Sequence, residues 1–347
     1  MRRLTATRDA PKESGSVTVI VALLMVALLG FVAIAIDVGK IYSERSELQN
    51  GADAAAVATA QKCARDASDA LCSTTSTLAA SLANQNALDG SSNVFSVQLD
   101  KTARTVAVTT SAKEAGSPDN SVSLFFADIL GIPTKEVGAL ASATWGSPLA
   151  GRTAFPLAFS ICQVKDNIGG ALQLLQEHGK NANLDCNYGP SGAAVQGGFG
   201  WLTQDPGVCG GTIDLSVGEG GSDPGNDAPG NCSTELNRWA SEIAAGREAV
   251  VLLPVFNKVT GTGSGAVYSM VYFAAFKVTG WKFSGSSGLP YEYRSEASAA
   301  TGVTAATECT GNCRGVIGSF VKYVSLADGY TLGPVDTSGT TIVRMTP

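Results

Sequence analysis

The chain has 347 residues, of which 44% are hydrophobic and 16% charged, enough apolar material for one large or two modest cores. The net charge is −6, the acidic residues are spread out, and no basic stripe is present, which argues against a nucleic-acid-binding role. The 40 glycines and recurring helix-breaking stretches predict a β-rich body with long loops.

An uninterrupted apolar segment covers residues 17–36, VTVIVALLMVALLGFVAIAI, and contains no charged residue. At about 1.5 Å per residue, a helix of this length spans the roughly 30 Å hydrocarbon core of a bilayer. The segment also lacks the polar stripe that a core helix of a soluble protein normally shows. We therefore expect a transmembrane helix, with the lipid bilayer as its partner.

The charges beside this segment predict its orientation. Residues 1–16 form a basic lead with four basic side chains, Arg2, Arg3, Arg8 and Lys12, against the two acidic ones, Asp9 and Glu13. Asp37 follows the segment directly, and the residues after the segment carry the chain's excess of acidic side chains. Because positive flanks stay in the cytoplasm, we expect a single-pass protein of the cell membrane with a cytoplasmic N-terminus and an extracytoplasmic body.

A cleaved secretory signal is the alternative interpretation of the same segment. Ala33-Ile34-Ala35 fits the small-residue cleavage pattern, and cleavage after Ala35 would release the body as a secreted protein. The apolar run is longer than the 7–15 residues of a typical signal peptide. Its length favours a retained anchor.

Helical character continues over residues 38–64, which contain no proline. One face of this helix would carry Ile41, Leu48, Ala52, Ala55 and Thr59. If unbroken from Val17 to Arg65, the helix would be on the order of 70 Å long, and Gly39 and Gly51 are the positions where it could break. Two interpretations stay open: a juxtamembrane stalk that packs on its own domain, or a helix that assembles with other helices through alanine-rich contacts.

Eight cysteines lie after the apolar segment, and none lies before or within it: Cys63, Cys72, Cys162, Cys186, Cys209, Cys232, Cys309 and Cys313. An even number in this position indicates disulfides formed in an oxidising compartment, although their connectivity does not follow from the sequence. A bridge between Cys63 and Cys72 would pin a helical hairpin. A zinc site is the weaker alternative, because no CxxC pair is present.

The segments up to residue 146 predict a small α+β domain over residues 37–146. We expect a helix over Thr75–Ala87, a β-hairpin around residues 95–108, a short apolar helix over residues 121–131 and a strand over Val137–Trp145. Gly146-Ser147-Pro148 interrupts the pattern and is taken as a domain boundary.

Residues 147–347 predict a β-rich extracytoplasmic domain, so the fold class is α+β. Strands are expected at Phe155–Val164, Val250–Phe256, Val267–Thr279, Tyr291–Tyr293 and Gly315–Val324, and helices at Gly170–His178 and Thr234–Ala245, the second capped by Thr234. Residues 187–231 are rich in glycine and contain no Lys or Arg, which predicts a loop held by bridges at Cys186, Cys209 and Cys232.

Residues suited to catalysis or to metal binding are scarce. His178 is the only histidine, so a histidine-rich metal site is excluded, and its place at an expected helix end is explained by the helix dipole. The glycine-rich stretches 218–221 and 261–265 lack the Gly-Lys-Ser/Thr ending of a phosphate-binding loop. We therefore expect no catalytic residue, no bound metal and no cofactor.

The N-terminal region carries an ordered set of motifs: Glu13-Ser-Gly-Ser16, the apolar segment, Asp37-Val-Gly-Lys-Ile-Tyr42 and Glu47-Leu-Gln-Asn-Gly-Ala-Asp-Ala-Ala-Ala56. This order resembles the TadE/TadG-like proteins of Flp (Tad) pilus assembly. The residues that match the family pattern are Gly15, Asp37, Gly39, Leu48, Gln49, Asp53, Ala54, Ala55 and Ala56. Gly51 occupies a place where that family usually has alanine, and Ile20 stands where processed pseudopilins carry glutamate five residues after the cleaved glycine.

The resemblance implies a membrane-anchored, non-enzymatic structural or assembly component of a bacterial Flp-type pilus or related secretion system. Its partners would be other pilus-assembly proteins, contacted through the N-terminal helix, and a homo-oligomer is also open. Two other functions remain as alternatives. One is a secreted or surface adhesin that binds through the loops of residues 187–231, and the other is an extracytoplasmic hydrolase that uses carboxylates.

Overall fold

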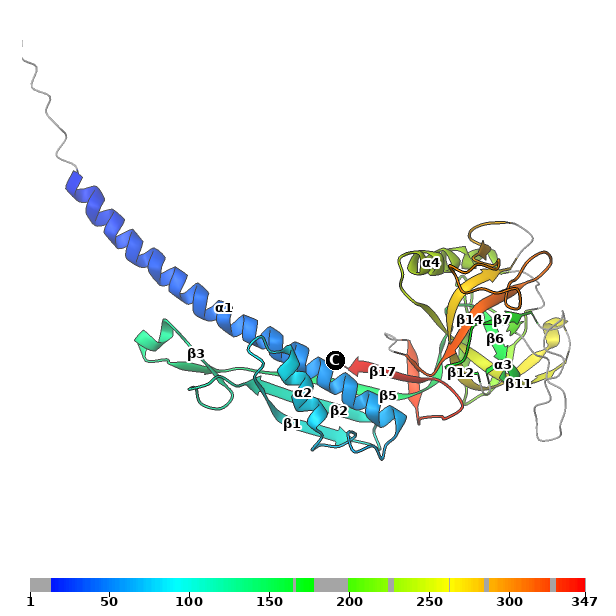
Figure 1. Cartoon of the computed structure of the whole chain (residues 1–347), viewed down its shortest axis with the longest axis horizontal. Helices are drawn as coiled ribbons and strands as arrows, with labels where there is room; N and C mark the ends of the chain where they lie inside the picture. The colour runs from blue at the N-terminus through cyan, green and yellow to red at the C-terminus, as the bar shows by residue number, and fades with distance from the viewer. Residues whose placement is uncertain are drawn as a thin grey trace, which may run out of the picture. The chain divides into compact units, whose positions relative to one another are not determined.

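The computed structural model describes residues 14–164, 167–177, 199–223, 228–261, 263–283, 287–324 and 329–346. These residues form two compact units. Unit 1 extends to Ala143 and takes up the chain again from Met345, and unit 2 covers Thr144–Arg344. The chain passes from one unit to the other within a single strand, β5 (Gly138–Arg152) (Figure 1).

The described residues contain both helices and many short strands. The helices are α1 (Ser14–Arg65), α2 (Thr77–Asn86), η1 (Ala127–Leu130, 3₁₀), α3 (Ile161–Val164), η2 (Gly230–Cys232, 3₁₀), α4 (Ser233–Ala244) and η3 (Gly263–Gly265, 3₁₀). The strands are β1 (Ser92–Asp100), β2 (Thr105–Ala112), β3 (Ser121–Ser123), β4 (Thr134–Glu136), β5 (Gly138–Arg152), β6 (Leu157–Ser160), β7 (Gln173–Gln176), β8 (Phe199–Trp201), β9 (Thr212–Asp214), β10 (Glu219–Gly221), β11 (Ala249–Thr260), β12 (Val267–Lys282), β13 (Glu292–Tyr293), β14 (Gly315–Val321), β15 (Tyr323–Val324), β16 (Tyr330–Gly333) and β17 (Thr341–Thr346).

Helix α1 is continuous over 52 residues, as Figure 1 shows, and neither Gly39 nor Gly51 breaks it. This confirms the long apolar N-terminal helix. Every large apolar side chain of residues 17–36 is exposed, and only the small Ala33 is half-buried. By length and composition this part of the helix could cross a membrane. This part of the helix has no polar face, so only an apolar environment would cover its surface favourably.

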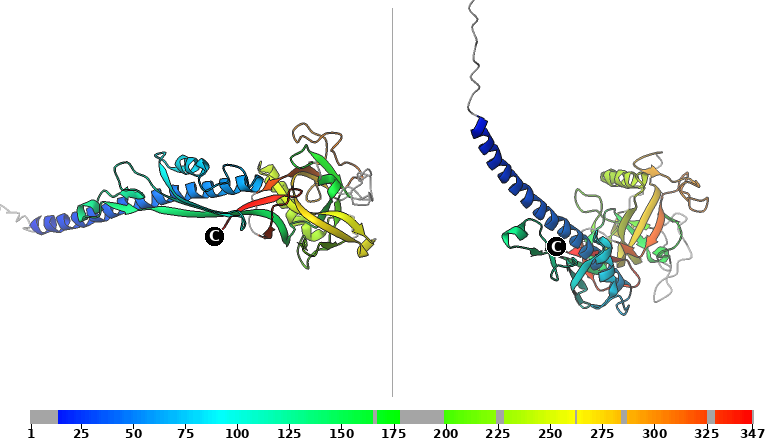
Figure 2. Two further views of the ribbon diagram at one scale, coloured as in Figure 1. Left: turned by 90° about the horizontal axis from the view of Figure 1, so that it is seen from below. Right: turned by 60° about the vertical axis from the view of Figure 1, so that its left-hand side comes forward.

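Unit 1 is built around the C-terminal half of α1. Helix α2, which begins after the Ser76 cap, lies beside α1, and the β1–β2 hairpin and the start of β5 follow in sheet order (Figure 2). The predicted hairpin and the helix over Thr75–Ala87 are therefore present. Of the two interpretations left open for residues 38–64, packing on the chain's own domain agrees with the structure, because the alanine-rich face is buried within unit 1.

The segment predicted as a short helix over residues 121–131 has a different structure. Its first residues form β3, which pairs antiparallel with β4, and only Ala127–Leu130 are helical, as the 3₁₀ turn η1. Gly131 ends this turn in the left-handed region at φ 81°. The prediction of a helix was wrong because Ser121–Ser123 pair with β4 as a strand, and because Gly131 ends the helical turn after Leu130.

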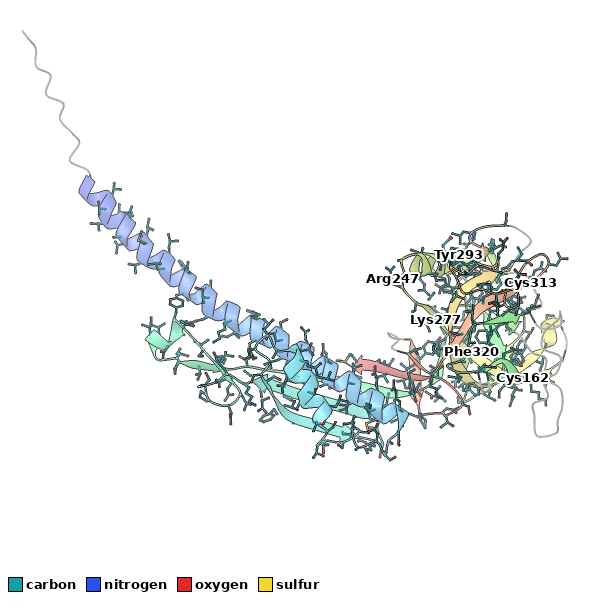
Figure 3. The ribbon with its side chains drawn as sticks, in the orientation of Figure 1. Cys162, Arg247, Lys277, Tyr293, Cys313 and Phe320 are labelled. Carbon is teal, nitrogen blue, oxygen red and sulfur yellow. A yellow bond between two sulfur atoms is a disulfide. The ribbon has the colours of Figure 1, made fainter. Side chains whose placement is uncertain are left out.

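Unit 2 has a mixed sheet with the strand order β7-β14-β12-β11-β6-β8, and β10 and β13 also pair with β12. The long antiparallel pair β11–β12 forms its centre. One face carries an aromatic core that includes Phe155, Trp239, Trp281 and Phe320, the last labelled in Figure 3. Helix α4 supplies Trp239, which lies 4.9 Å from Phe155 and 5.7 Å from Trp281 between ring centroids.

Two predictions in this region are wrong. Gly170–His178 was expected to be helical, but Gln173–Gln176 form strand β7 along β14, and His178 lies outside the described residues. The strand expected over Val137–Trp145 runs on through Gly146-Ser147-Pro148 as β5, and the two units divide inside this strand, between Ala143 and Thr144, rather than after it. Pro148 is tolerated because its pairing with Leu332 of β16 falls at an irregularity in the ladder, where a missing N–H costs little.

Three further boundaries differ from the sequence prediction. The expected strand Phe155–Val164 divides into β6 and the short helix α3. Helix α4 is present, but it begins at Ser233 with Cys232 as its N-cap residue, so Thr234 lies inside the helix. The range 187–231, expected as loop, contains the strands β8, β9 and β10 within its described part. A long apolar helix, a β-rich remainder and disulfides are confirmed.

Candidate functional site

The first family-motif residue after the apolar segment, Asp37, receives hydrogen bonds from a distant part of the chain. The backbone N–H groups of Phe125 and Ala127 donate to its carboxylate at 2.8 and 2.7 Å, and Phe126 donates to both oxygens at 3.0 and 3.3 Å. These amides open η1, whose first N–H groups have no partner inside the turn. Asp37 therefore satisfies the start of η1 from a position 88 residues earlier in the chain.

The ionised form of Asp37 is the one that suits this place. Its burial acts to raise the pKa, but the amide donors of Ala127, Phe125 and Phe126, together with the nearby Lys40, outweigh that effect and hold the pKa below its ordinary value. An acceptor with two oxygens and a negative charge matches three converging N–H donors. The side chain thus remains a charged clamp at neutral pH.

A second contact joins the same helix and the same segment one turn further along. Lys40 Nζ lies 2.9 Å from Glu114 Oε1 and 2.9 Å from the Ser123 hydroxyl. Glu114 in turn accepts the backbone N–H of Ser123 at 2.6 Å. Burial acts to raise the pKa of Glu114, but the hydrogen bond from the Ser123 amide and the charge of Lys40 outweigh this effect. The pKa therefore lies below its ordinary value. Asp37 and Lys40 are three residues apart and share a helix face.

The second motif, around Leu48 to Ala56, forms the buried face of α1. Leu48 packs with Ala112, Val122, Leu124, Val137 and Ala139, and Thr110 Oγ1 donates to the Leu48 carbonyl at 2.8 Å. Ala55 and Ala56 are fully buried, as is Ala52 beside them. Small side chains at these positions let α2 and β2 approach the helix backbone closely.

Gly51 shows how close that approach is. A Cβ atom at this position would lie 3.1 Å from the Cα of Ala83 in α2 and 3.4 Å from its carbonyl oxygen. At Gly39, in contrast, a Cβ would have no neighbour within 4 Å. The glycine at position 51 is therefore explained by packing against α2, whereas the glycine at position 39 has no contact in unit 1 that requires it.

The remaining motif residues have smaller roles in the structure. Gln49 donates to Asp53 Oδ1 at 2.8 Å and to the Leu140 carbonyl at 3.3 Å, linking α1 to β5. Ala54 is half-buried. Gly15 lies in the first turn of α1, and no further role is visible for it.

The two motifs of the family pattern therefore both contact the rest of unit 1 from α1. The Asp37 motif does so near the apolar segment, and the Leu48–Ala56 motif does so further along the helix. Sequence reasoning missed the residues that complete these contacts, namely Lys40, Thr110, Glu114 and Ser123. The spacing of Lys40, three residues after Asp37, was a usable signal. The partners in β2, β3 and the preceding loop carried none, because they are separated from α1 by more than 60 residues.

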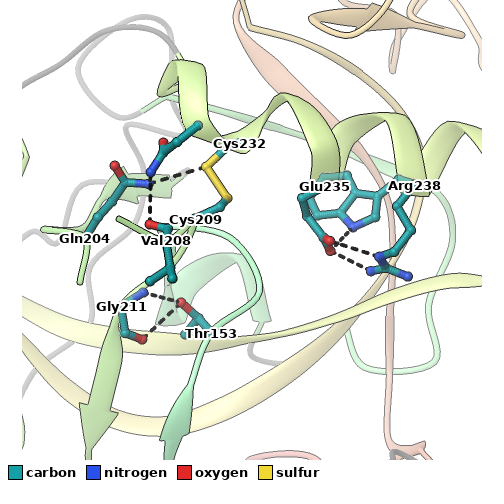
Figure 4. The surroundings of a disulfide bond; sticks show 10 residues. Thr153, Gln204, Val208, Cys209, Gly211, Cys232, Glu235 and Arg238 are labelled. Atoms are coloured by element: carbon teal, nitrogen blue, oxygen red, sulfur yellow. Dashed lines mark hydrogen bonds and ion pairs between the residues drawn. A yellow bond between two sulfur atoms is a disulfide. The ribbon is translucent and has the colours of Figure 1, made fainter. Parts of the chain in front are cut away.

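Disulfides fix the ends of several elements. Cys63–Cys72 closes the turn after α1, Cys209–Cys232 joins the segment before β9 to the start of α4, and Cys309–Cys313 closes a short loop before β14. Figure 4 shows the second bridge, where Gln204 donates toward Cys232 Sγ at 3.4 Å. Cys162 is also disulfide-bonded, and Cys186 lies outside the described residues.

Unit 2 has an open groove with a volume of about 420 Å³. Its lining consists of Arg238, Glu242, Glu248, Val250, Val321, Tyr323 and Val324. The charged members are already paired: Glu242 with Arg247, Glu248 with Lys277 and Arg238 with Glu235. Within the described ranges no group of three metal-binding side chains converges. The groove offers ion pairs rather than a set of groups arranged for catalysis.

The family comparison agrees with the motif interface. The family model described as putative Flp pilus-assembly TadE/G-like matches residues 15–62, which cover the apolar part of α1, the Asp37–Lys40 level and the buried alanine face. No curated protein and no solved structure matches the chain. The match indicates involvement in Flp pilus assembly. Residues 15–62 thus carry the TadE/G-like family region that the motifs around Asp37 and Leu48 predict.

Proposed function

We propose that the protein is a membrane-anchored, non-enzymatic component of an Flp-type pilus apparatus, with residues 17–36 spanning the cell membrane, the N-terminus in the cytoplasm and both units outside. The observation that carries the proposal is the division of one continuous helix. Its first part is apolar and exposed, and its second part, from Asp37, buries one face within unit 1. Both parts lie in the matched family region.

Charge and sulfur chemistry both support the proposed orientation. The basic residues of the lead precede the helix, and the disulfide-bonded cysteines follow it. Positive flanks favour the cytoplasmic side, and stable disulfides favour an oxidising compartment. The two arguments are independent and give the same direction.

Partner contacts through α1 would use its apolar part. The alanine face, an alternative expected from the sequence, is buried against α2 and β2 within the same chain. Replacing Ala52, Ala55 or Ala56 with bulky residues would therefore disturb unit 1 itself. The large apolar side chains of residues 17–36 are exposed and would contact other membrane helices of the apparatus, including a second copy of this chain.

Membrane extraction of the full-length protein tests the anchor. Leu24→Arg combined with Leu28→Arg should move the protein from the membrane pellet to the soluble fraction after carbonate washing, because each arginine costs about 2.5–3.5 kcal/mol at the centre of a membrane helix. Tyr42→Arg is the matched control, since Tyr42 is also exposed on the same helix but lies outside the apolar segment. Its variant should stay in the pellet.

Two outcomes would overturn parts of this proposal. Recovery of wild-type protein in the medium with Ile36 as its first residue would show a cleaved signal instead of an anchor. A C-terminal reporter that is active only outside the cytoplasm should be active here, and its inactivity would reverse the orientation. Co-purification of the tagged full chain with membrane components of the pilus apparatus, lost in the double arginine variant, would support assembly through the apolar part of α1.

A further inference from the structure

A cluster of large apolar side chains is exposed around η1, although the same segment also contributes to the core. The cluster consists of Phe125, Phe126, Ile129, Leu130 and Ile132, and we refer to it as the apolar tip. Ile129 and Leu130 are each 81% exposed, and Phe125 is 75% exposed. Five such residues within eight positions form a contiguous patch, which soluble proteins normally avoid unless it meets a partner or a membrane.

The apolar tip is not a loose end of the core. Val122 and Leu124, from the same segment, are buried beside Leu48, so the inward-facing positions are already filled. Pairing of β3 with β4 and the left-handed Gly131 fix the turn between them. The exposed side chains therefore point outward because the local structure places them there.

Two clamps fix the level of the apolar tip along α1. Asp37, the first residue after the apolar segment, holds the amides of residues 125–127, and Lys40 holds Glu114 and Ser123 at the base of the same segment. The tip therefore lies beside the end of the apolar segment. Both views of Figure 2 show η1 next to α1 on the side of its N-terminal half, away from α2.

The size of the apolar tip suits an interfacial depth. Residues 124–133 form a closed turn, in which the Leu124 N–H donates to the Pro133 carbonyl at 2.8 Å and the Ile132 N–H donates to the Ala127 carbonyl at 3.0 Å. At the 2 Å rise of a 3₁₀ helix, the residues of η1 between Ala127 and Leu130 span on the order of 6–8 Å. Apolar groups of interfacial segments are buried about 5–10 Å into the boundary between headgroups and acyl chains. Between Phe125 and Pro133 the single charged residue is Asp128, and Lys135 and Glu136 follow on β4. Asp128 lies inside the patch and is exposed, so its carboxylate would stay at headgroup level, and the charges of Lys135 and Glu136 follow where the segment leaves the headgroup region.

We propose that the apolar tip inserts into the outer leaflet beside the transmembrane helix and forms a second, monotopic membrane contact. The occupant is lipid because the exposed apolar surface of the tip continues the exposed apolar surface of residues 17–36 at the same level of α1. This inference rests on the proposed anchoring of the chain. It adds that unit 1 is seated on the membrane surface rather than held away from it.

Lipid-resolved fluorescence of the full-length protein in vesicles tests the insertion. Ile129→Trp places a new indole in the tip, and Leu88→Trp is the matched control, because Leu88 is 88% exposed in unit 1 but lies just after α2. With lipids brominated near the headgroup, more than about half of the emission added at position 129 should be lost, since an indole about 5–10 Å deep lies at the level of the bromine. The emission added at position 88 should be unaffected.

Flotation of the same vesicles separates the two proposals. If the protein floats with the vesicles but the indole at position 129 is not quenched, the tip does not insert and the anchor stands. If the emission at position 129 is blue-shifted and depends on protein concentration without quenching by bromolipid, a second copy covers the tip, and the lipid assignment is wrong. If the protein does not float, both proposals are overturned.

Discussion

At the scale of single residues, Asp37 has the most informative environment. Its carboxylate is the acceptor for three consecutive amides, and those donors outweigh the effect of burial on its pKa. An aspartate in this role is a structural requirement of the contact between α1 and η1, because no neutral side chain of similar size offers two oxygen acceptors. The family-motif aspartate is therefore explained by a fold contact and needs no catalytic role.

Asp37→Asn should weaken the clamp. The asparagine NH₂ group would face backbone donors in place of one oxygen, so hydrogen-exchange protection of the amides at residues 125–127 should fall. Asp53→Asn on the same helix is the control, because Asp53 accepts from Gln49 and has no contact with η1. Equal protection of these amides in wild type and Asp37→Asn would show that the carboxylate does not hold them.

The wild-type clamp should also depend on pH with a defined sign. Because the folded pKa of Asp37 lies below the ordinary value of 3.8, its contribution to stability is present above that value and is lost only as the pH falls through the lower, folded pKa. Protection factors at residues 125–127, corrected for intrinsic exchange, should therefore be constant from neutral pH to about 4 and should fall below that. The Asp37→Asn variant should lack this fall.

At the scale of secondary-structure elements, the packing of unit 1 depends on the close approach of α1 and α2. Gly51→Leu should destabilise unit 1 by about 1–3 kcal/mol, because the side chain would meet the backbone of Ala83 and push the helices apart. Gly39→Leu should instead be neutral or stabilising by up to about 1 kcal/mol, since that site is open and leucine favours helix. Chemical denaturation followed by circular dichroism measures both. Similar stabilities for the two variants would contradict the packing of α2 on Gly51.

The same scale shows what the sequence could predict. Helix α1 followed from a long apolar run and an alanine-rich continuation without proline, and the β1–β2 hairpin followed from alternation around a polar turn. Gly170–His178 was misassigned because its apolar residues also suit a helix, whereas pairing along β14 decides the structure of so short a segment. The Asp37 clamp was not predictable either. Its partners are backbone amides, which any sequence would supply, so only the fold reveals them.

At the scale of the whole molecule, each unit has its own core. The aromatic cluster of unit 2 and the cluster around Leu48 in unit 1 share no residue. Trp239→Ala should cost unit 2 about 3–5 kcal/mol, because Trp239 is fully buried between Phe155 and Trp281. Hydrogen-exchange protection in α2 should be unchanged in this variant. Leu48→Ala is the converse control and should lower protection in α2 and leave β11 unchanged; loss of protection in both units from either change would mean that they unfold as one.

The unbroken course of α1 through Asp37 also fixes angles about its own axis. Successive residues of an α-helix turn by about 100°, so each side chain between Val17 and Ile36 has a set azimuth relative to unit 1. A neighbouring helix that prefers one side of this segment in the bilayer thereby determines which side of unit 1 is turned toward it. One residue inserted between Ile36 and Asp37, before the first contact with unit 1, would rotate that choice by about 100° while leaving the composition of both parts almost unchanged. The unbroken helix thus determines which side of unit 1 faces a neighbouring protein in the membrane.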